Sequence, residues 1–567
     1  MQLKKYHSTR RFFPFGLLFF IFFPFFLSCG DSWISVSDPD KMDAAAQNEL
    51  RQLLIESANE FVKIDDSTLL NRTSWVNEYY KINQYKIVWS EAAVAGTKAD
   101  TLIDFIKNAR LLGLLPDDYH SSKLTILKNE IDRDSLSKGI RRKPKMWACF
   151  DLLLTDALLS MMRDLHEGRR TADSLYGKPI KPKDSVFYYS YFRRFMNESS
   201  LKDGFAELEP QTEEYKSLKE ALITFLDSAD FSKSYTYLRY PYKDSTAFSD
   251  SLILRLKEGG WLDSLSRKVD SAMLAKTIIK IQDDNDLGRD GKAGRRLVGF
   301  LNRTDREIFR TISLNLDRHR QLQHILPDDY IGVNLPGFYL YVKENNHNLL
   351  YSRVVVGKPS TRTPVLNSFL SDIVIYPEWT IPNGIIAKEI LPALRRNPGF
   401  LARRGYKLLG KGGQPVNPHA VNWHKFSGTI PYRVVQGSGD NNALGVLKFN
   451  FQNPYSVYMH DTNQRYLFGN DNRSLSHGCV RVQEWEKLAH YVITRDNSLY
   501  RRNDGVGVAG IDSLNAWLSR KENHVLELKG RIPLFFTYLT AEGKDGKLVL
   551  HEDIYGEDQA LRHFYSF

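Results

Sequence analysis

Hydrophobic periodicity divides the chain into a helical part and a part rich in strands. Between residues 45 and 240, apolar side chains recur at the three- and four-residue spacing of amphipathic helices. The clearest run extends from Phe150 to Leu165 and ends at Gly168, a typical helix stop. Residues 247–305 show the same spacing in two or three shorter runs. We therefore predict a helical domain over 45–240 and a small helical module over 247–305.

The periodicity changes at Asp328, where alternation of apolar and polar residues begins and predicts β-strands. An amphipathic helical segment over 385–404 interrupts the strands and ends at Gly405. With 567 residues the chain is too long for a single core. We expect a multidomain α+β protein whose C-terminal domain is mostly β. The predicted strands are 330–342, 349–356, 372–376 and a closing pair at 531–540 and 547–555, with helices at 483–494 and 511–520.

The N-terminus has the pattern of an export signal. Basic residues precede an apolar run over 12–27, which is shorter than the roughly 20 residues of a membrane-spanning helix and contains prolines. The run ends in Phe26-Leu-Ser-Cys29-Gly, which resembles a bacterial lipobox, with Phe26 where leucine is usual. We expect a signal peptide over 1–28, a lipid on Cys29 and a tether over 29–44. An uncleaved anchor and a soluble secreted protein are the alternatives.

Composition and charge limit the cellular location and the partners that we expect. The formal net charge of +11 suits an anionic cell envelope as well as nucleic acid, but no nucleic-acid-binding motif is present. We therefore expect no nucleic-acid partner and a membrane-anchored, periplasm-facing location. The chain has three cysteines. If Cys29 carries a lipid and Cys479 is the catalytic cysteine considered below, only Cys149 remains, so no disulfide framework is available.

The candidate chemistry lies in two short stretches, 459–463 and 474–482. Cys479 has His477 two residues before it and His460 nineteen residues before it. A cysteine attacks as the thiolate and needs a nearby base or positive field, which histidine supplies near neutral pH. We predict that Cys479 is a nucleophile, with a proton acceptor among the two histidines. Strand-like alternation on both sides places Cys479 and His460 at neighbouring strand ends.

Other residues of these stretches have candidate roles. Gly478 has no side chain, so a substrate carbonyl can approach the backbone N–H groups of 477–479, which are candidate oxyanion-hole donors. Asp461 and Thr462 follow His460 and are placed to orient its ring. A buried cysteine with satisfied histidines is the plain alternative. Zinc is a second alternative, but no Cys-x-x-Cys or His-Glu-x-x-His spacing is present, so we expect neither metal nor cofactor.

The run Ser476-His-Gly-Cys-Val-Arg481 with the upstream His-Asp-Thr resembles the active-site motif of YkuD-type L,D-transpeptidases. Further stretches resemble the YcbB-like subclass; they are 108–119, 331–342, 353–358, 389–394 and 444–449. The resemblance implies a scaffold domain, a peptidoglycan-binding-like module and a YkuD-type domain with a helical cap. The implied ranges are 45–240 for the scaffold, 247–305 for the module, 328–540 for the catalytic domain with its capping insertion at 385–425, and 541–567 for a C-terminal extension packing on it.

The same resemblance implies a reaction. Cys479 would attack the bond between diaminopimelate and terminal D-alanine in a peptidoglycan stem, releasing D-alanine and leaving a thioester. The amine of a second stem would resolve it, giving a direct diaminopimelate–diaminopimelate cross-link. The resemblance favours His460 as the base and leaves His477 as the reserve base in the oxyanion-hole region. The implied substrate contacts are Arg481, Tyr458 and Asp461.

Three other functions remain open at this stage. Water resolving the thioester would make the protein an L,D-carboxypeptidase, and a protein amine would make it an enzyme that attaches proteins to peptidoglycan. A non-catalytic peptidoglycan-binding lipoprotein is the alternative from a different class. The resemblance has one departure, since Asn463 stands where the subclass often has proline.

Overall fold

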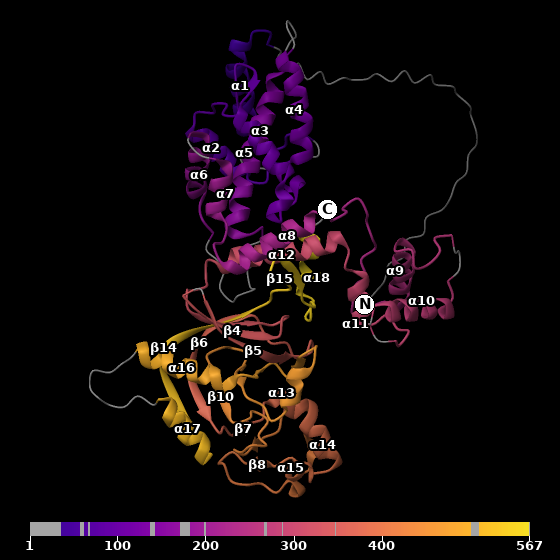
Figure 1. Cartoon of the computed structure of the whole chain (residues 1–567), viewed down its shortest axis with the longest axis vertical. Coiled ribbons are helices and arrows are strands. Elements are labelled where there is room, and N and C mark those ends of the chain that lie inside the picture. Colours follow the sequence, from indigo (N-terminus) through magenta and orange to yellow (C-terminus); the bar gives the residue numbers. More distant parts are fainter. Residues whose placement is uncertain are drawn as a thin grey trace, which may run out of the picture.

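Figure 1 shows an elongated molecule with a helical domain at one end, a sheet domain at the other and a small helical module beside them. Among the residues that the structure describes, no helix is long and apolar enough to cross a membrane. The predictions for the signal segment and Cys29 lie outside these residues. The computed structural model describes residues 36–565 except 57–61, 66–67, 137–141, 170–181, 198–199, 266–268, 286, 288, 346 and 500–509.

The helical domain is built around α5 (Pro144–Glu167), which starts with a proline in its first turn and is buried over almost its whole length. The predicted run of apolar residues therefore forms the central helix of this domain. Its neighbours bury one face each against it. They are α1 (Met42–Glu56), α2 (Thr73–Ile82), α3 (Thr97–Lys107), α4 (Ser121–Leu136), α6 (Ser185–Asn197) and α7 (Leu201–Leu208).

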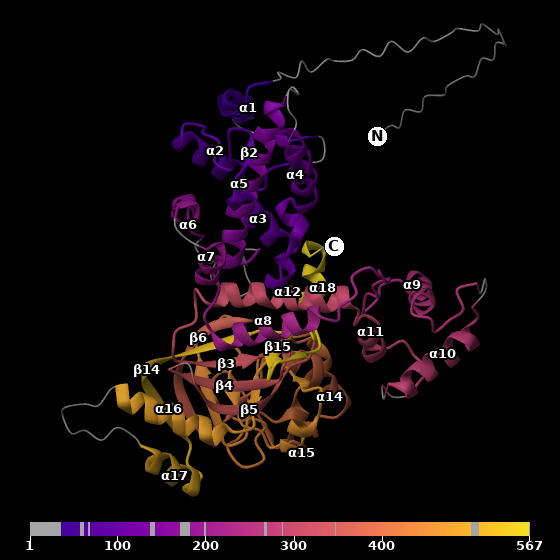
Figure 2. The same cartoon turned by 45° about the horizontal axis from the view of Figure 1, so that its top comes forward.

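Two long helices separate this domain from the sheet domain (Figure 2). They are α8 (Glu213–Leu226) and α12 (Asp305–Leu322), and they share a small core with Ala541. The hairpin β15 (Ala541–Lys544) and β16 (Lys547–Leu550) packs on α8. The C-terminal segment is therefore tied to these helices as well as to the sheet domain.

The small module contains α9 (Ser245–Glu258), α10 (Ser271–Asp284) and α11 (Arg295–Leu301), as the periodicity predicted. Its helices surround a core of their own. One ion pair, 3.1 Å long, joins Arg295 to Glu552 of the C-terminal segment. The module is thus a separately packed unit at the side of the molecule (Figure 1).

A nine-stranded sheet forms the second domain, in the order β12-β5-β13-β11-β10-β6-β14-β3-β4. Because β4 also pairs with β5, the sheet closes on itself. Helices α16 (Trp485–Leu499) and α17 (Ile511–Arg520) cover one face. The strands are β3 (Tyr330–Asn334), β4 (Tyr339–Glu344), β5 (His347–Gly357), β6 (Leu366–Ile375), β10 (Leu447–Phe451), β11 (Met459–His460), β12 (Ser474–Ser476), β13 (Val480–Val482) and β14 (His524–Thr537).

Two strand predictions need correction. The segment predicted as one strand at 330–342 is two strands, because the chain turns at Phe338, whose φ is 55°. The predicted closing pair is also wrong: β14 lies between β6 and β3, whereas β16 pairs with β15 in a separate hairpin. The chain leaves the sheet after β14 because the Thr540 N–H donates to Asn315 of α12 at 2.8 Å.

The helical segment predicted at 385–404 is present as four short helical elements followed by Gly405, and we call the lobe that contains it the cap. A three-stranded sheet extends it, and Trp423 lies in their common core. The cap thus has an internal core and stands as a lobe on the sheet domain. The elements are β7 (Trp379–Thr380), α13 (Asn383–Ile385), η4 (Ile386–Ile390), α14 (Leu391–Arg396), α15 (Phe400–Arg403), β8 (Tyr406–Leu409) and β9 (Arg433–Gln436).

Candidate active site

Strand register places a row of basic side chains across three neighbouring strands. Lys448 of β10 pairs with His460 of β11, which pairs with Arg481 of β13. Side chains alternate between the two faces of a sheet. The alternate residues of these strands enter the core; they are Leu447, Phe449, Met459, Val480 and Val482. Lys448, His460 and Arg481 therefore share the opposite face.

Cys479 lies on the same face, two residues before Arg481 of this row. The Val480 N–H donates to the Tyr458 carbonyl at 3.0 Å, which sets Cys479 beside Tyr458. The thiol is half-buried, and burial raises its pKa. The Tyr458 backbone N–H and hydroxyl oppose this rise and lower the pKa of the thiol. The positive charges of Lys448 and Arg481 lower it as well. The structure thus places Cys479 just before β13 and His460 at the end of β11, on two neighbouring strands.

His460 is buried, and its Nδ1 hydrogen-bonds to the carbonyl of Asp461. Burial and the nearby Arg481 guanidinium lower the pKa of His460 to about 3. The ring is therefore neutral at physiological pH. A neutral imidazole is the form that accepts a proton from a thiol.

The backbone of Asp461, rather than its carboxylate, orients the His460 ring. The Asp461 side chain is buried and accepts hydrogen bonds from the Val446 N–H at 3.0 Å and from Arg465 Nη2 at 2.8 Å. Each carboxylate oxygen thus accepts a hydrogen bond from within the protein, and the substrate contact expected from the sequence stays a prediction. Asp461 instead fixes the loop that precedes β10.

Gly478 has a φ of 121°, a conformation that favours glycine. Its N–H donates to Ser476 Oγ at 3.0 Å, and its carbonyl accepts from Thr363 Oγ1 at 2.7 Å. The Gly478 N–H is therefore already engaged, which differs from the predicted oxyanion-hole role. The neighbouring Cys479 N–H makes no hydrogen bond with any residue that the structure describes. It is the better candidate donor to an oxyanion.

His477 lies at the boundary between the nucleophile loop and the cap. Its side chain is exposed, and its Nε2 lies 2.5 Å from Glu389 Oε1 of η4. This contact directs the ring toward the cap. Because His477 is held in this way, His460 is the better candidate base, and His477 is a link between the cap and the loop.

Arg481 and Tyr458 remain candidates for substrate contact. Arg481 donates through Nη1 to Gln464 at 2.8 Å, whereas its buried Nε has no hydrogen-bond partner among the described residues. The Tyr458 hydroxyl accepts from Trp379 Nε1 of the cap at 3.0 Å. The cap thus reaches the site through Trp379, whereas Trp423 packs inside the cap.

Lys448 is the site residue that sequence reasoning missed. Its Nζ lies 4.2 Å from the centre of the Tyr458 ring, and burial lowers its pKa. The alternation Leu447-Lys-Phe-Asn-Phe451 carried the signal, because it places Lys448 on the face opposite the core. No cluster of three or more His, Cys, Asp or Glu side chains suited to a metal occurs in the described part of the chain.

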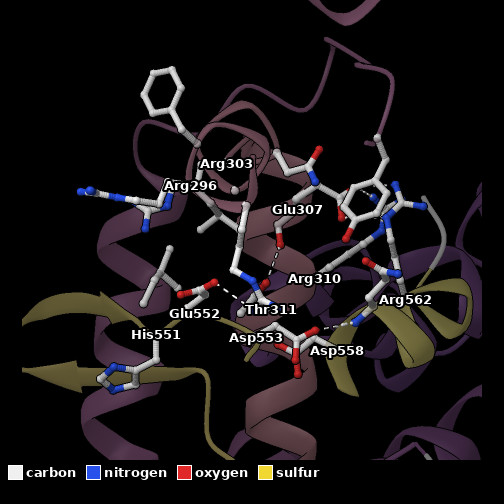
Figure 3. Close-up of a pocket in the computed structure, with 18 of the residues that line it drawn as sticks. Arg296, Arg303, Glu307, Arg310, Thr311, His551, Glu552, Asp553, Asp558 and Arg562 are labelled. Carbon is white, nitrogen blue, oxygen red and sulfur yellow. Dashed lines mark hydrogen bonds and ion pairs between the residues drawn. The ribbon is translucent and has the colours of Figure 1, made fainter. Parts of the chain in front are cut away.

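A cavity of about 650 Å³ lies elsewhere, between α11, α12 and the C-terminal segment (Figure 3). Its charged side chains mostly pair with one another: Arg562 donates to Glu307 at 2.9 Å, and Arg295 pairs with Glu552 at 3.1 Å. No cysteine lines it. We interpret it as a polar seam between the module and the rest of the protein.

Comparisons with known proteins give two domain matches and one relative. Residues 328–498 match the L,D-transpeptidase catalytic domain (YkuD), and residues 74–222 match the Scaffold domain. A relative from Haemophilus influenzae named "Putative L,D-transpeptidase" is 34% identical over 252 residues, which are 44% of this chain and 49% of the relative. The chain thus spans about half the length of this relative.

One solved structure, "Structure of the Ldtfm-avibactam carbamoyl enzyme", matches over 59% of this chain and 98% of its own. The sequence identity is 11% and the TM-score is 0.16. This structural likeness is too low to bear on the fold or the function of the chain.

Proposed function

We propose that the chain is a peptidoglycan L,D-transpeptidase acting through a thioester on Cys479, since residues 328–498 match the L,D-transpeptidase catalytic domain. The observation that carries the proposal is the placement of His460 on β11 and of Cys479 immediately before the adjacent strand β13, on the face opposite the core. The proposed substrates are a tetrapeptide donor stem and a second stem that supplies the acceptor amine.

In the acylation step, the neutral His460 ring accepts the proton of the Cys479 thiol as sulfur attacks the carbonyl between diaminopimelate and D-alanine. The Cys479 N–H is placed to donate to the oxyanion that forms. The carbon–nitrogen bond then breaks, and the proton on His460 passes to the departing D-alanine amine. A thioester on Cys479 and free D-alanine are the products.

In the second step, the side-chain amine of the acceptor stem attacks the thioester and gives up a proton to His460. The carbon–sulfur bond breaks, the proton returns to sulfur, and a direct cross-link between two diaminopimelate residues remains. Water competes with this amine. The cap, linked to the site through Trp379–Tyr458 and Glu389–His477, supports the proposal because a lobe in this place limits the access of water.

Muropeptide analysis tests the proposal and separates its rivals. The protein is incubated with a disaccharide tetrapeptide, and a dimer lacking one terminal D-alanine is expected. Tripeptide alone would identify a carboxypeptidase, and muropeptides linked to an added envelope protein would identify the attachment enzyme. Unchanged substrate with folded protein would favour the non-catalytic binding lipoprotein. Cys149→Ala is the matched control, because this buried cysteine lies in α5.

The lipid anchor on Cys29 and the periplasm-facing location are part of the same proposal. They are supported by the basic residues, apolar run and lipobox-like end of residues 1–30. Mass spectrometry of the N-terminus of the mature protein tests them. A mature chain that begins anywhere other than an acylated Cys29 would contradict the anchor.

A further inference from the structure

Lys448 lies on the face of the sheet that carries Cys479, between β6 and β11. It pairs with Val374 of β6 on one side and with His460 on the other. The side chain is half-buried, and its ammonium stands over the Tyr458 ring at 4.2 Å. Within the described residues, no ion pair closer than 4.0 Å includes Lys448. The charge is therefore held in place without a carboxylate in contact.

Asp372 is the carboxylate near this ammonium, and neutral side chains hold it by hydrogen bonds. The carboxylate that faces it belongs to Asp372 of β6, and its two oxygens accept from Asn450 Nδ2 at 2.6 Å and from Ser371 Oγ at 2.7 Å. The remaining ionisable neighbours come from β11, β13 and the residues immediately before these strands; they are Tyr458, His460, Cys479 and Arg481. Of these four, Cys479 is the group that becomes an anion when its proton passes to a base in the proposed reaction.

We propose that Lys448 is a positioning residue of the Cys479 site, which holds the Tyr458 ring against the thiol and supplies the positive charge that favours the thiolate. The inference rests on the proposed function only in taking Cys479 as the nucleophile. A cation over an aromatic ring is attracted to it, and the attraction is stronger where water is partly excluded. Tyr458 in turn lies beside Cys479, so the lysine acts on the thiol through the ring and through its field.

The same charge has a second effect, on His460. A cation near an imidazole opposes its protonation, and Lys448 and Arg481 lie on either side of His460 in the row. Both lower the pKa of His460, and both lower the pKa of Cys479. Lys448 therefore stabilises the anion and discourages a lasting imidazolium. A proton taken up by His460 is passed on to the leaving amine rather than retained.

Replacing Lys448 by Met keeps a long side chain and removes the charge. We expect the pKa of Cys479, measured from the pH dependence of iodoacetamide alkylation, to rise by about one unit, which is a tenfold loss of thiolate at neutral pH. The pKa of His460, measured by NMR titration of the ring, should rise as well. Lys448→Arg restores the charge and should return both values close to those of the native protein.

The signs of these two shifts separate the field effect from simple loosening. Loss of charge raises both pKa values, whereas entry of water into a loosened site raises that of His460 and lowers that of Cys479. An unchanged or lowered Cys479 pKa in Lys448→Met, or a failure of Lys448→Arg to restore it, would overturn the proposal. Lys448→Gln is the second neutral variant, interpreted by the same signs if the Met variant does not fold.

The control is Lys547→Met, an exposed lysine of β16 outside the sheet of the site, for which neither pKa should change. Neither measurement uses peptidoglycan. Failure of the native protein to form cross-links would therefore contradict the proposed function and leave the inference about Lys448 standing. Unchanged pKa values in the variants would contradict the inference about Lys448 and leave the proposed function standing.

Discussion

Two regions of the molecule bury polar groups, and they do so in opposite ways. In the helical domain, carboxylates of α5 are surrounded by donors: Asp156 accepts from the Arg72 N–H at 2.7 Å and from His120 Nε2 at 2.6 Å. In the sheet domain, Lys448, His460 and Arg481 stand in one row without a carboxylate among them, and Arg481 Nε has no hydrogen-bond partner within the described residues.

The difference separates buried polar groups that stabilise the fold from buried polar groups that take part in the proposed reaction. A buried carboxylate that accepts from several loops fixes those loops, and its removal leaves donors unsatisfied. Cations that are not in contact with a carboxylate contribute little to folding, but they shift the pKa values of the groups near them. By this criterion α5 holds the fold together, and the basic row serves the reaction at Cys479.

Asp151→Ala should give the largest loss of stability. Asp151 is fully buried in α5 and accepts from the Tyr80 hydroxyl, the Val88 N–H and the Trp89 N–H. Its removal leaves the Val88 and Trp89 N–H groups without this acceptor, whereas the Tyr80 hydroxyl keeps Thr155, and we expect a loss of about 3–5 kcal/mol in the free energy of unfolding. Urea unfolding measures this loss, and the alkylation rate of Cys479 in the folded fraction should not change. A loss below about 1 kcal/mol would contradict the view that the carboxylates of α5 stabilise the fold.

His460→Gln should give the opposite result. The thiol loses its proton acceptor, and acylation should fall about 10²–10⁴-fold. Stability at neutral pH should change little, because a glutamine amide can still donate to the Asp461 carbonyl that His460 contacts. Acyl-enzyme formation is followed by mass spectrometry, with His477→Gln as the matched control. Full activity in His460→Gln with loss in His477→Gln would reverse the assignment of the base.

The two regions should also respond to pH in opposite directions. Burial raises the pKa of Asp151 to about 7, so the folded protein keeps a proton that the unfolded chain loses above about pH 4. Stability of the helical domain should therefore fall as pH rises from about 4 to 7. The pKa of His460 is lowered to about 3, so the unfolded chain binds a proton below about pH 6.5 that the folded protein does not. The sheet domain should therefore weaken as pH falls through this window.

Hydrogen exchange at pH 5 and pH 7, read separately for α5 and for the strands of the site, measures these responses after correction for intrinsic exchange. Asp151→Asn should flatten the response of the helical domain, and His460→Gln that of the sheet domain. If both regions gain or lose protection together, the comparison fails.

Glu389→Gln should have the smallest effect. It removes the charge of a contact in which Glu389 and His477 are both partly exposed, and such pairs contribute about 0–1 kcal/mol. We expect the ratio of hydrolysis to cross-linking to rise by less than about tenfold, because one of the two cap contacts remains. Product analysis of the muropeptides measures the ratio. A complete loss of acylation would instead give Glu389 a role at the reacting atoms.

The sequence predicted the parts of this account that depend on local pattern. Alternation around His460 and Cys479 was enough to place both residues at neighbouring strand ends, and the run from Phe150 to Leu165 was enough to identify the central helix. Lys448 was within reach by the same rule, since it stands between two apolar residues of a strand.

Partners distant along the chain could not be predicted in this way. Periodicity gives the face of a strand but not the group that meets it, so the engagement of Asp461 by Val446 and Arg465 was missed. The contact between His477 and Glu389 joins residues from two separate lobes and has no local signature. The turn of the chain after β14 depends on Asn315, far earlier in the sequence.

The central claim is that Cys479 is the acylated nucleophile. Its most direct test is intact-mass spectrometry of the protein mixed with a disaccharide tetrapeptide, followed by peptide mapping, beside Cys479→Ala and Cys149→Ala. We predict a transient adduct, smaller than the substrate by one D-alanine, on Cys479 in the native protein and in Cys149→Ala, and none in Cys479→Ala. An adduct that persists in Cys479→Ala, or that maps to another residue, would contradict the account.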